Sequence, residues 1–171
     1  AGTLEAFGQS LGSLSVPEIV ALGMGRIPED RNHEGVIGEM PVWENAVLER
    51  LPLFSRRGLV DRRRAMAFAR QVIEGFDVRG ATPRTRTGLL SGGNVQKLIL
   101  GRNLIRNPRI LLAAQPARGL DEGAVAAVHR RLLEARAQGT AILLISEDLD
   151  EVMDLSDRIH AIVGGRLSPA V

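Results

Sequence analysis

Residues 110–145 read ILLAAQPARGLDEGAVAAVHRRLLEARAQGTAILLI, and they establish the class of fold. Two short apolar runs in this stretch, Ile110–Ala114 and Ala141–Ile145, are typical of buried strands. Between them, residues 122–138 place apolar side chains on one face of a helix: Val125, Val128 and Leu132. Because a strand, a crossover helix and a second strand give parallel neighbours, the stretch predicts an α/β fold with a mainly parallel sheet.

The ends of this unit carry the residue types of helix and strand boundaries. Asp121 is the predicted N-cap of the helix, and Gly139 is its predicted C-terminal stop. After the second strand, the sequence predicts another helix at Leu149–Leu155 and a further strand at 158–163. We therefore expect the parallel sheet to continue toward the C-terminus.

The first half of the chain has a different pattern. Short strands are predicted at 3–7 and at Met24–Ile27, around a helix at 17–22. Helices are then predicted at 43–51, 61–76 and 95–105, with a loop-like connection at 77–90. We take the 77–90 connection as a subdomain boundary, so these elements predict two pieces of α/β structure that bracket a helical insert.

The composition excludes several classes of protein. The 171 residues are 44% hydrophobic and 25% charged and contain no cysteine, so thiol chemistry and disulfides are absent. Uninterrupted apolar runs stay near five residues, far below the roughly 20 of a membrane helix. Arginine clusters at 56–57 and 62–64 predict a solvated face, and with no tyrosine and few other aromatic residues we expect no nucleic-acid partner.

One lysine limits the possible chemistry. Of the 22 lysine and arginine residues, only Lys97 is a lysine, and it follows Gln96. The phosphate-binding loop GxxxxGK[ST] is therefore absent from this sequence. The high pI of about 10.2 follows from the arginine-rich, tyrosine-free composition, while the net charge is only +2.

The sequence LSGGNVQK at 90–97 places Ser91 and two glycines at the start of a predicted helix. Backbone N–H groups at a helix N-terminus, together with the helix dipole, suit an anion such as a phosphate. The alternative is structural: Ser91 caps the helix, and the glycines make the turn.

Four ordered motifs make a resemblance specific: LSGGNVQK at 90–97, QPARGLD at 115–121, LLISEDLDE at 143–151 and SDRI at 156–159. Together they resemble the nucleotide-binding domain of an ATP-binding cassette (ABC) protein. The chain is most similar to the second cassette of tandem importers for simple sugars or nucleosides, where IPEDR at 27–31 also has a counterpart. The resemblance implies a partial RecA-like P-loop NTPase core at residues 1–29 and 91–171, with an ABC helical subdomain at residues 30–90. It also implies that the phosphate loop would precede residue 3, so we expect this chain to be a fragment that lacks it.

Three positions depart from the family pattern. Ala114 and Gln115 stand where the family has an aspartate that helps hold Mg²⁺ and a glutamate that polarises the attacking water, and Glu147 replaces the switch histidine. Alanine offers no oxygen to a metal, an amide accepts no proton, and a carboxylate repels a phosphate. We therefore predict a degenerate hydrolytic site and no hydrolysis by this fragment alone.

Other family positions are retained. The resemblance implies that Ser91, Gly92, Gly93 and Asn94 contact ATP held by a partner cassette. It places Asp121 in the loop called the D-loop and Glu29 at a Q-loop-like position that couples to the membrane subunit.

At the level of the whole assembly, the resemblance implies ATP and Mg²⁺ as cofactors, neither bound tightly by this fragment. It implies a second nucleotide-binding domain and a transmembrane permease as partners, and a solute-binding protein as an indirect one. The expected location is peripheral, on the cytoplasmic face of the cell membrane. His33, His129 and His160 are too scattered in sequence to predict a metal site.

Two other functional classes remain open. One is a soluble ABC-type ATPase of chromosome maintenance or translation, which shares the LSGG turn; neither a coiled-coil insertion nor a long basic linker occurs in this sequence. The other is a regulatory interaction domain that does not contact ATP.

Overall fold

The computed structural model describes residues 2–170 and combines a small parallel sheet with packed helices. The strands are β1 (Glu5–Ala6), β2 (Gln9–Ser10), β3 (Met24–Ile27), β4 (Ser55–Arg56), β5 (Leu59–Val60), β6 (Ile110–Ala114), β7 (Ala141–Ile145), β8 (Ile162–Val163) and β9 (Arg166–Leu167). The α-helices are α1 (Val16–Ala21), α2 (Val42–Val47), α3 (Arg62–Gly75), α4 (Gly92–Leu104), α5 (Glu122–Ala137) and α6 (Leu149–Leu155).

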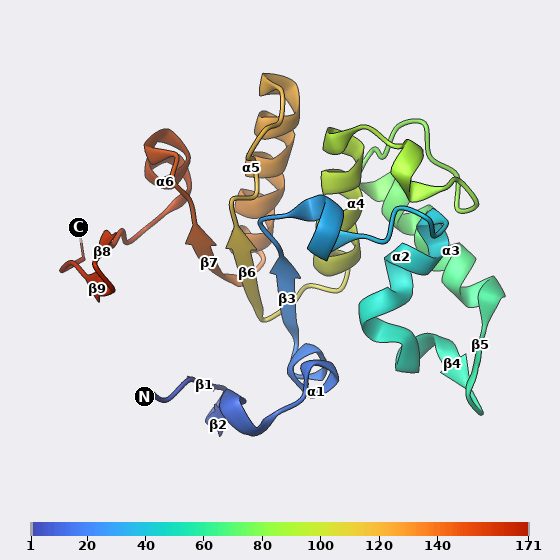
Figure 1. Ribbon diagram of the computed structural model, residues 1–171, viewed down its shortest axis with the longest axis horizontal. Helices are drawn as coiled ribbons and strands as arrows, with labels where there is room; N and C mark the ends of the chain where they lie inside the picture. The colour runs from blue at the N-terminus through green and yellow to red at the C-terminus, as the bar shows by residue number, and fades with distance from the viewer. Residues whose placement is uncertain (1, 171) are drawn as a thin grey trace.

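The central sheet has three parallel strands in the order β3-β6-β7. Helices α4 and α5 lie beside it, and apolar side chains of β3 and β6 are fully buried with those of the helices (Figure 1). The members of this core with no exposed surface include Ile27, Leu98, Ile99 and Leu111. The predicted α/β class, the strands at Met24–Ile27, Ile110–Ala114 and Ala141–Ile145, and the parallel pairing are confirmed.

A buried amide connects α4 to the outer edge of the sheet. The Asn103 side chain accepts a hydrogen bond from the Arg26 N–H at 3.2 Å and donates one to the Arg26 carbonyl at 3.0 Å. Strand β3 has no neighbouring strand on this side among the described residues. The amide therefore satisfies two backbone groups that an edge strand would otherwise leave unpaired.

Two predicted strands are shorter than expected, and the one at 158–163 does not continue the parallel sheet. At 3–7, only Glu5–Ala6 is a strand, and it pairs with β2; at 158–163, only Ile162–Val163 is a strand, and it pairs with β9. In both hairpins a two-residue turn with positive φ closes the strands, at Phe7-Gly8 and Gly164-Gly165. Such turns match the twist of adjacent antiparallel strands, so each segment folds back on itself and does not join the central sheet.

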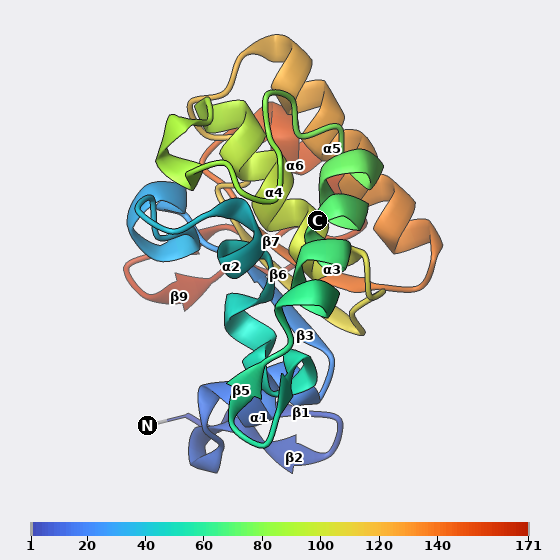
Figure 2. The ribbon, with the colours of Figure 1, turned by 90° about the vertical axis from the view of Figure 1, so that its right-hand side faces the viewer.

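The helical region contains α2, α3 and a hairpin, and it packs against α4 from the other side (Figure 2). The helix predicted at 43–51 is shorter than expected: α2 ends at Val47, and two short 3-10 turns follow within Leu48–Phe54, separated by non-helical backbone at Arg50. Gly101 is where α3 and α4 approach closely, because a Cβ there would lie 2.7 Å from Val72 Cγ1. Helix α4 therefore contacts both the helical region and the sheet.

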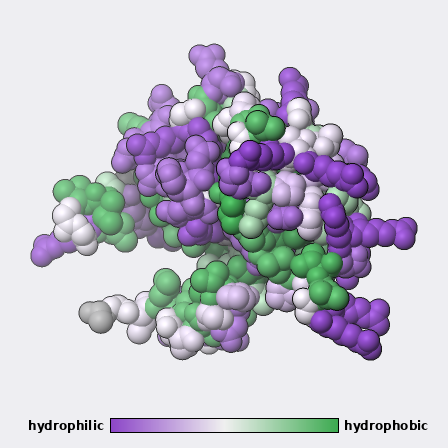
Figure 3. All heavy atoms as spheres, turned by 45° about the vertical axis from the view of Figure 1, so that its right-hand side comes forward, coloured by the Kyte–Doolittle hydropathy of each residue, from purple (hydrophilic) through white to green (hydrophobic). Residues whose placement is uncertain are grey.

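One side of the sheet remains open along β7. Leu143 and Ile145 are more than half exposed, and apolar side chains of α6 and the C-terminal hairpin are exposed as well. That hairpin projects at the left of Figure 3 and carries apolar surface. No helix among the described residues is long and apolar enough to cross a membrane.

Candidate functional site

The start of α4 is open to an external partner. Ser91 has extended backbone angles at the N-cap position, but its side chain makes no capping hydrogen bond. Instead, Ser91 Oγ accepts a hydrogen bond from Asn94 Nδ2 at 2.9 Å. The first N–H groups of a helix have no partner within the helix, and here no side-chain cap fills their place. The capping role proposed for Ser91 as an alternative is therefore wrong, and the 91–94 turn presents donors for an anion.

The side chain of Asn94 fixes the shape of this turn. Its Oδ1 accepts a hydrogen bond from the Arg79 N–H at 2.8 Å, while its Nδ2 donates to Ser91. Next to it, Lys97 Nζ donates to the carbonyl and to the carboxylate of Asp77, each at 3.0 Å. The 77–79 loop is thus tied to the first turns of α4 at three points.

The charges beside the turn are paired within the chain. The hydrogen bond from Lys97, together with the nearby positive charges of Lys97 and Arg79, holds the pKa of the Asp77 carboxyl below its ordinary value. Arg79 Nε donates to the same carboxylate at 3.0 Å. The Asp77 carboxylate therefore partly neutralises the positive charge near the turn. The backbone N–H groups and Ser91 remain available to a ligand.

The structure brings Asp121 next to the 91–94 turn. A pocket of about 330 Å³ has both among its lining residues. Asp121 Oδ1 accepts from the Ala124 N–H at 2.9 Å, so its predicted role as the N-cap of α5 is confirmed. A Cβ on Gly93 would lie 3.4 Å from the Ala124 Cβ, which shows how closely α4 and α5 begin beside each other.

The three positions that depart from the family pattern lie elsewhere, at the carboxyl ends of β6 and β7. Ala114 ends β6, and Gln115 follows it with a positive φ of 48° and donates its N–H to the Ile145 carbonyl at 2.7 Å. The Gln115 Oε1 accepts from the Glu147 N–H at 3.4 Å. Ala114 has no side-chain oxygen, and Gln115 offers an uncharged amide in place of a carboxylate, so the pair is a poor set of ligands for Mg²⁺.

Glu29 lies where β3 ends, and it contacts the loop that follows β6. Its carboxylate forms an ion pair with the Arg118 guanidinium. Both side chains are more than half exposed, so the pair contributes little to the free energy of unfolding. It nevertheless places the 29–35 segment against the 115–121 loop.

Two residues of the site were missed by the sequence analysis. Gln96 is 2% exposed, and its Nε2 donates to the Pro116 carbonyl at 2.6 Å, which ties the 115–121 loop to α4. Arg31 donates from Nη1 to the Arg118 carbonyl at 2.6 Å. A glutamine within an apolar helix is a usable signal for a buried polar contact; nothing in the sequence pattern identifies the partner of Arg31.

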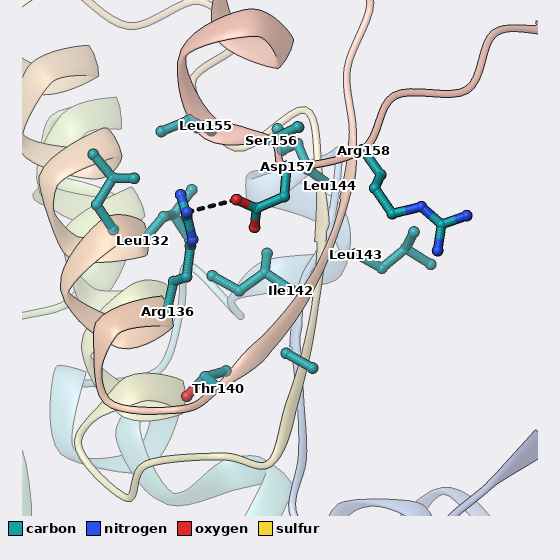
Figure 4. Close-up of a pocket in the computed structure, with 12 residues that line it drawn as sticks. Leu132, Arg136, Thr140, Ile142, Leu143, Leu144, Leu155, Ser156, Asp157 and Arg158 are labelled. Carbon is teal, nitrogen blue, oxygen red and sulfur yellow. Dashed lines mark hydrogen bonds and ion pairs between the residues drawn. The ribbon is translucent and has the colours of Figure 1, made fainter. Parts of the chain in front are cut away.

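A separate pocket lies between α5, β7 and the segment that follows α6 (Figure 4). It has a volume of about 310 Å³, and it contains the ion pair between Arg136 Nη2 and Asp157 Oδ1 at 2.6 Å. Leucine and isoleucine side chains form much of its lining, and none of the predicted site residues borders it. Within residues 2–170, no group of three or more His, Asp or Glu side chains could hold a metal ion.

Comparison with known proteins gives strong sequence matches over the whole chain. The chain is 40% identical to the nucleoside import ATP-binding protein NupA of Lactococcus lactis over 99% of its length, and 42% identical to the guanosine import ATP-binding protein NupO of Bacillus subtilis. It is 41% identical to the glucose import ATP-binding protein TsgD13 of Haloferax volcanii. The chain spans about a third of the length of these relatives: 34%, 34% and 31%. No family model matches the sequence.

Comparison of structures supports the same relationship at the level of the fold. A dimeric ATP-binding cassette in a post-hydrolysis state with ADP and phosphate matches with a TM-score of 0.77 and 20% sequence identity, over 97% of this chain and 71% of that one. A nucleotide-free ATP-binding cassette from an ABC transporter matches with a TM-score of 0.70, over 95% of this chain and 66% of that one.

Proposed function

Because this chain belongs to the ATP-binding cassette family by sequence and by fold, we propose that it works as part of the ATP-binding subunit of an importer for a simple sugar or nucleoside. In this proposal its own hydrolytic positions are degenerate, and it supplies the 91–94 turn to an ATP molecule held by a second cassette. The observation that carries the proposal is the open, uncapped start of α4, where Ser91 and the backbone of Gly92, Gly93 and Asn94 present donors.

The geometry of the turn supports binding of a phosphate from outside the chain. Ser91, Gly93 and Asn94 line one pocket with Asp121. Backbone N–H groups at the end of a 13-residue helix give a phosphate both hydrogen bonds and a favourable dipole. The 91–94 turn therefore complements the phosphates of a nucleotide held by another domain.

The ends of β6 and β7 support the second element of the proposal, the loss of hydrolysis. ATP would bring Mg²⁺ with it, and the metal would supply charge neutralisation at the transferring phosphate. Neither Ala114 nor Gln115 provides a carboxylate to hold that metal or to accept a proton from water. Glu147 would place a negative charge beside the phosphate, so Mg²⁺ and the reacting water are assigned to the partner's side.

The proposal also assigns roles to the other parts of the chain. Residues 1–29 and 91–171 are assigned to the ATPase core and residues 30–90 to a helical subdomain that contacts a transmembrane permease. Glu29, at the junction, couples the two, and a solute-binding protein acts on the permease from the other side. The subunit would lie peripherally on the cytoplasmic face of the membrane, where closure of two cassettes moves the helical region as a rigid body.

The test is Ser91→Arg in the complete transporter in lipid vesicles, with Ser13→Arg, an exposed serine of the N-terminal region, as the matched control. A large side chain in the 91–94 turn blocks the approach of a phosphate, so we expect ATPase activity to fall to background. Ser13→Arg is expected to leave it within about twofold of wild type, as surface substitutions usually do. Unchanged turnover of Ser91→Arg would contradict the proposal.

The two alternatives predict different results. A soluble ATPase of chromosome maintenance or translation would purify without a permease, whereas the importer subunit should purify with one. A regulatory domain that does not contact ATP would give no photo-cross-link between azido-ATP and the 90–97 peptide in the intact assembly. The open turn favours the cross-link.

A further inference from the structure

Arg31 connects the 29–35 segment to the loop that follows β6. Its Nη1 donates to the Arg118 carbonyl at 2.6 Å, and its Nη2 lies 3.5 Å from the Gly119 carbonyl. Gly119 has a φ of +66°, a conformation that side chains rarely adopt. The two successive carbonyl oxygens therefore both face the guanidinium, and the loop that leads to Asp121 starts from this contact.

The same guanidinium lies against the first residue of α4. A Cβ built on Gly92 would be 3.0 Å from Arg31 Nη2 and 3.3 Å from Arg31 Nε, so any side chain there would displace the arginine. Arg31 Nε is buried and has no hydrogen-bond partner. A buried donor without a partner costs free energy, and the surrounding contacts must hold the guanidinium in place despite this cost.

The backbone that carries Arg31 is fixed by its neighbours. Asp30 Oδ1 accepts from the N–H groups of Asn32 and His33, each at 3.0 Å. At the end of the segment, a Cβ on Gly35 would lie only 2.5 Å from Ile99 Cδ1, so the turn is pressed against α4. The Glu29–Arg118 ion pair joins the same two segments, and here the arginine comes from the 115–121 loop.

We infer that Arg31 is a positioning residue for the 91–94 turn. It holds the start of α4, the 115–121 loop and the segment of Glu29 in one arrangement, although it does not itself line the pocket at Ser91. The inference rests on the proposed function, because it assigns Arg31 to the geometry of the ATP contact made by this turn. A displacement of the 91–94 turn by about 1 Å would weaken its contacts with the transition state of ATP hydrolysis. The site on the second cassette that holds the nucleotide would be unchanged.

The experiment uses the complete transporter with Arg31→Ala, Arg31→Lys and, as a control, Arg130→Ala, which removes an exposed arginine of α5. Arg31→Ala should lower kcat about tenfold or more and leave the binding of labelled ATP, measured without Mg²⁺, within about twofold of wild type. Arg31→Lys should recover part of kcat, because an ammonium group can donate to one of the two carbonyls. Arg130→Ala should leave both quantities unchanged.

A coupling measurement tests the contact itself. Gly92→Ala should lower kcat in wild type and have a smaller effect in the Arg31→Ala background, because the clash partner is then missing. Additive effects would overturn the inference, as would a kcat for Arg31→Ala within twofold of wild type or a parallel loss of ATP binding. If Ser91→Arg abolishes turnover while Arg31→Ala does not lower it, the inference fails alone; if Ser91→Arg has no effect, the proposed function fails.

Discussion

Helix α4 and strand β7 are both central to this fold, yet their surroundings differ. From Val95 to Leu104, α4 is buried at every position except Lys97, between the helical region and the sheet. Strand β7 buries Ile142 and Leu144 partly and leaves Leu143 and Ile145 exposed. The difference shows that packing within this chain holds the body of α4, from which the 91–94 turn extends, while the strand-end positions lie beside an open side of the sheet.

The chemistry of the two regions follows the same division. At the start of α4, side chains and backbone groups are arranged to leave helix donors free, with Asn94 holding Ser91 in place. At the end of β6, the side chain of Gln115 is used for a structural contact with the backbone of Glu147. In the proposed function, the first region contacts a ligand and the second serves as scaffold.

The largest effect on stability is expected from Gly101→Ala, which tests whether close packing fixes α4. The new Cβ would lie 2.7 Å from Val72 Cγ1 and 2.9 Å from the Phe76 ring, so α3 and α4 must separate. We expect the free energy of unfolding of this chain, measured in urea, to fall by about 1–3 kcal/mol. Gly75→Ala is the matched control at an open position of α3, expected to be neutral or to stabilise by less than about 1 kcal/mol. Equal effects would contradict the account of α4.

A change in activity should separate the two regions directly. Asn94→Ala removes the hydrogen bonds to Ser91 Oγ and from the Arg79 N–H, so the 91–94 turn loses its fixed shape. In the complete transporter we expect ATPase turnover to fall about tenfold, the scale of a lost positioning contact. Gln115→Ala should change it less than about twofold. The reverse order of effects would place the chemistry at the end of β6.

The smallest effect expected is a pH dependence of stability that comes from Asp77, whose contacts with Lys97 and Arg79 anchor the loop beside the 91–94 turn. The pKa of Asp77 is lowered in the folded chain by Lys97 and Arg79, so the folded carboxylate holds its proton less tightly than the unfolded one. Its stabilising contribution is therefore present above its ordinary pKa of about 3.9 and is lost as the pH falls through the lowered value. The difference in unfolding free energy between wild type and Asp77→Asn should be constant near neutral pH and shrink below about pH 4.

Because Asp77 and Arg79 are exposed and Lys97 is only partly buried, 1 M salt should reduce the same difference at neutral pH. If the difference in unfolding free energy between wild type and Asp77→Asn grows on acidification, the ionised Asp77 does not stabilise the fold.

Sequence reasoning correctly predicted the elements with long apolar patterns. The run at Ile110–Ala114, the helix that follows it and the run at Ala141–Ile145 all formed as expected, with Asp121 as the N-cap. It was wrong where turn chemistry mattered more than apolar pattern. The Phe7-Gly8 and Gly164-Gly165 turns closed local hairpins, and a further hairpin at Arg57-Gly58 was not predicted.

The sequence by itself determined the α/β class, the family and the residue types at each chemical position, because apolar spacing and motif order are local properties of the chain. The tertiary structure alone revealed that Ser91 stands at the N-cap position without a side-chain capping bond, that Gln115 accepts a hydrogen bond from the Glu147 N–H, and that Arg31 reaches the loop after β6 and the first turn of α4. These contacts join residues up to 88 positions apart. Such pairs are set by how the helices and strands pack, which no local pattern specifies.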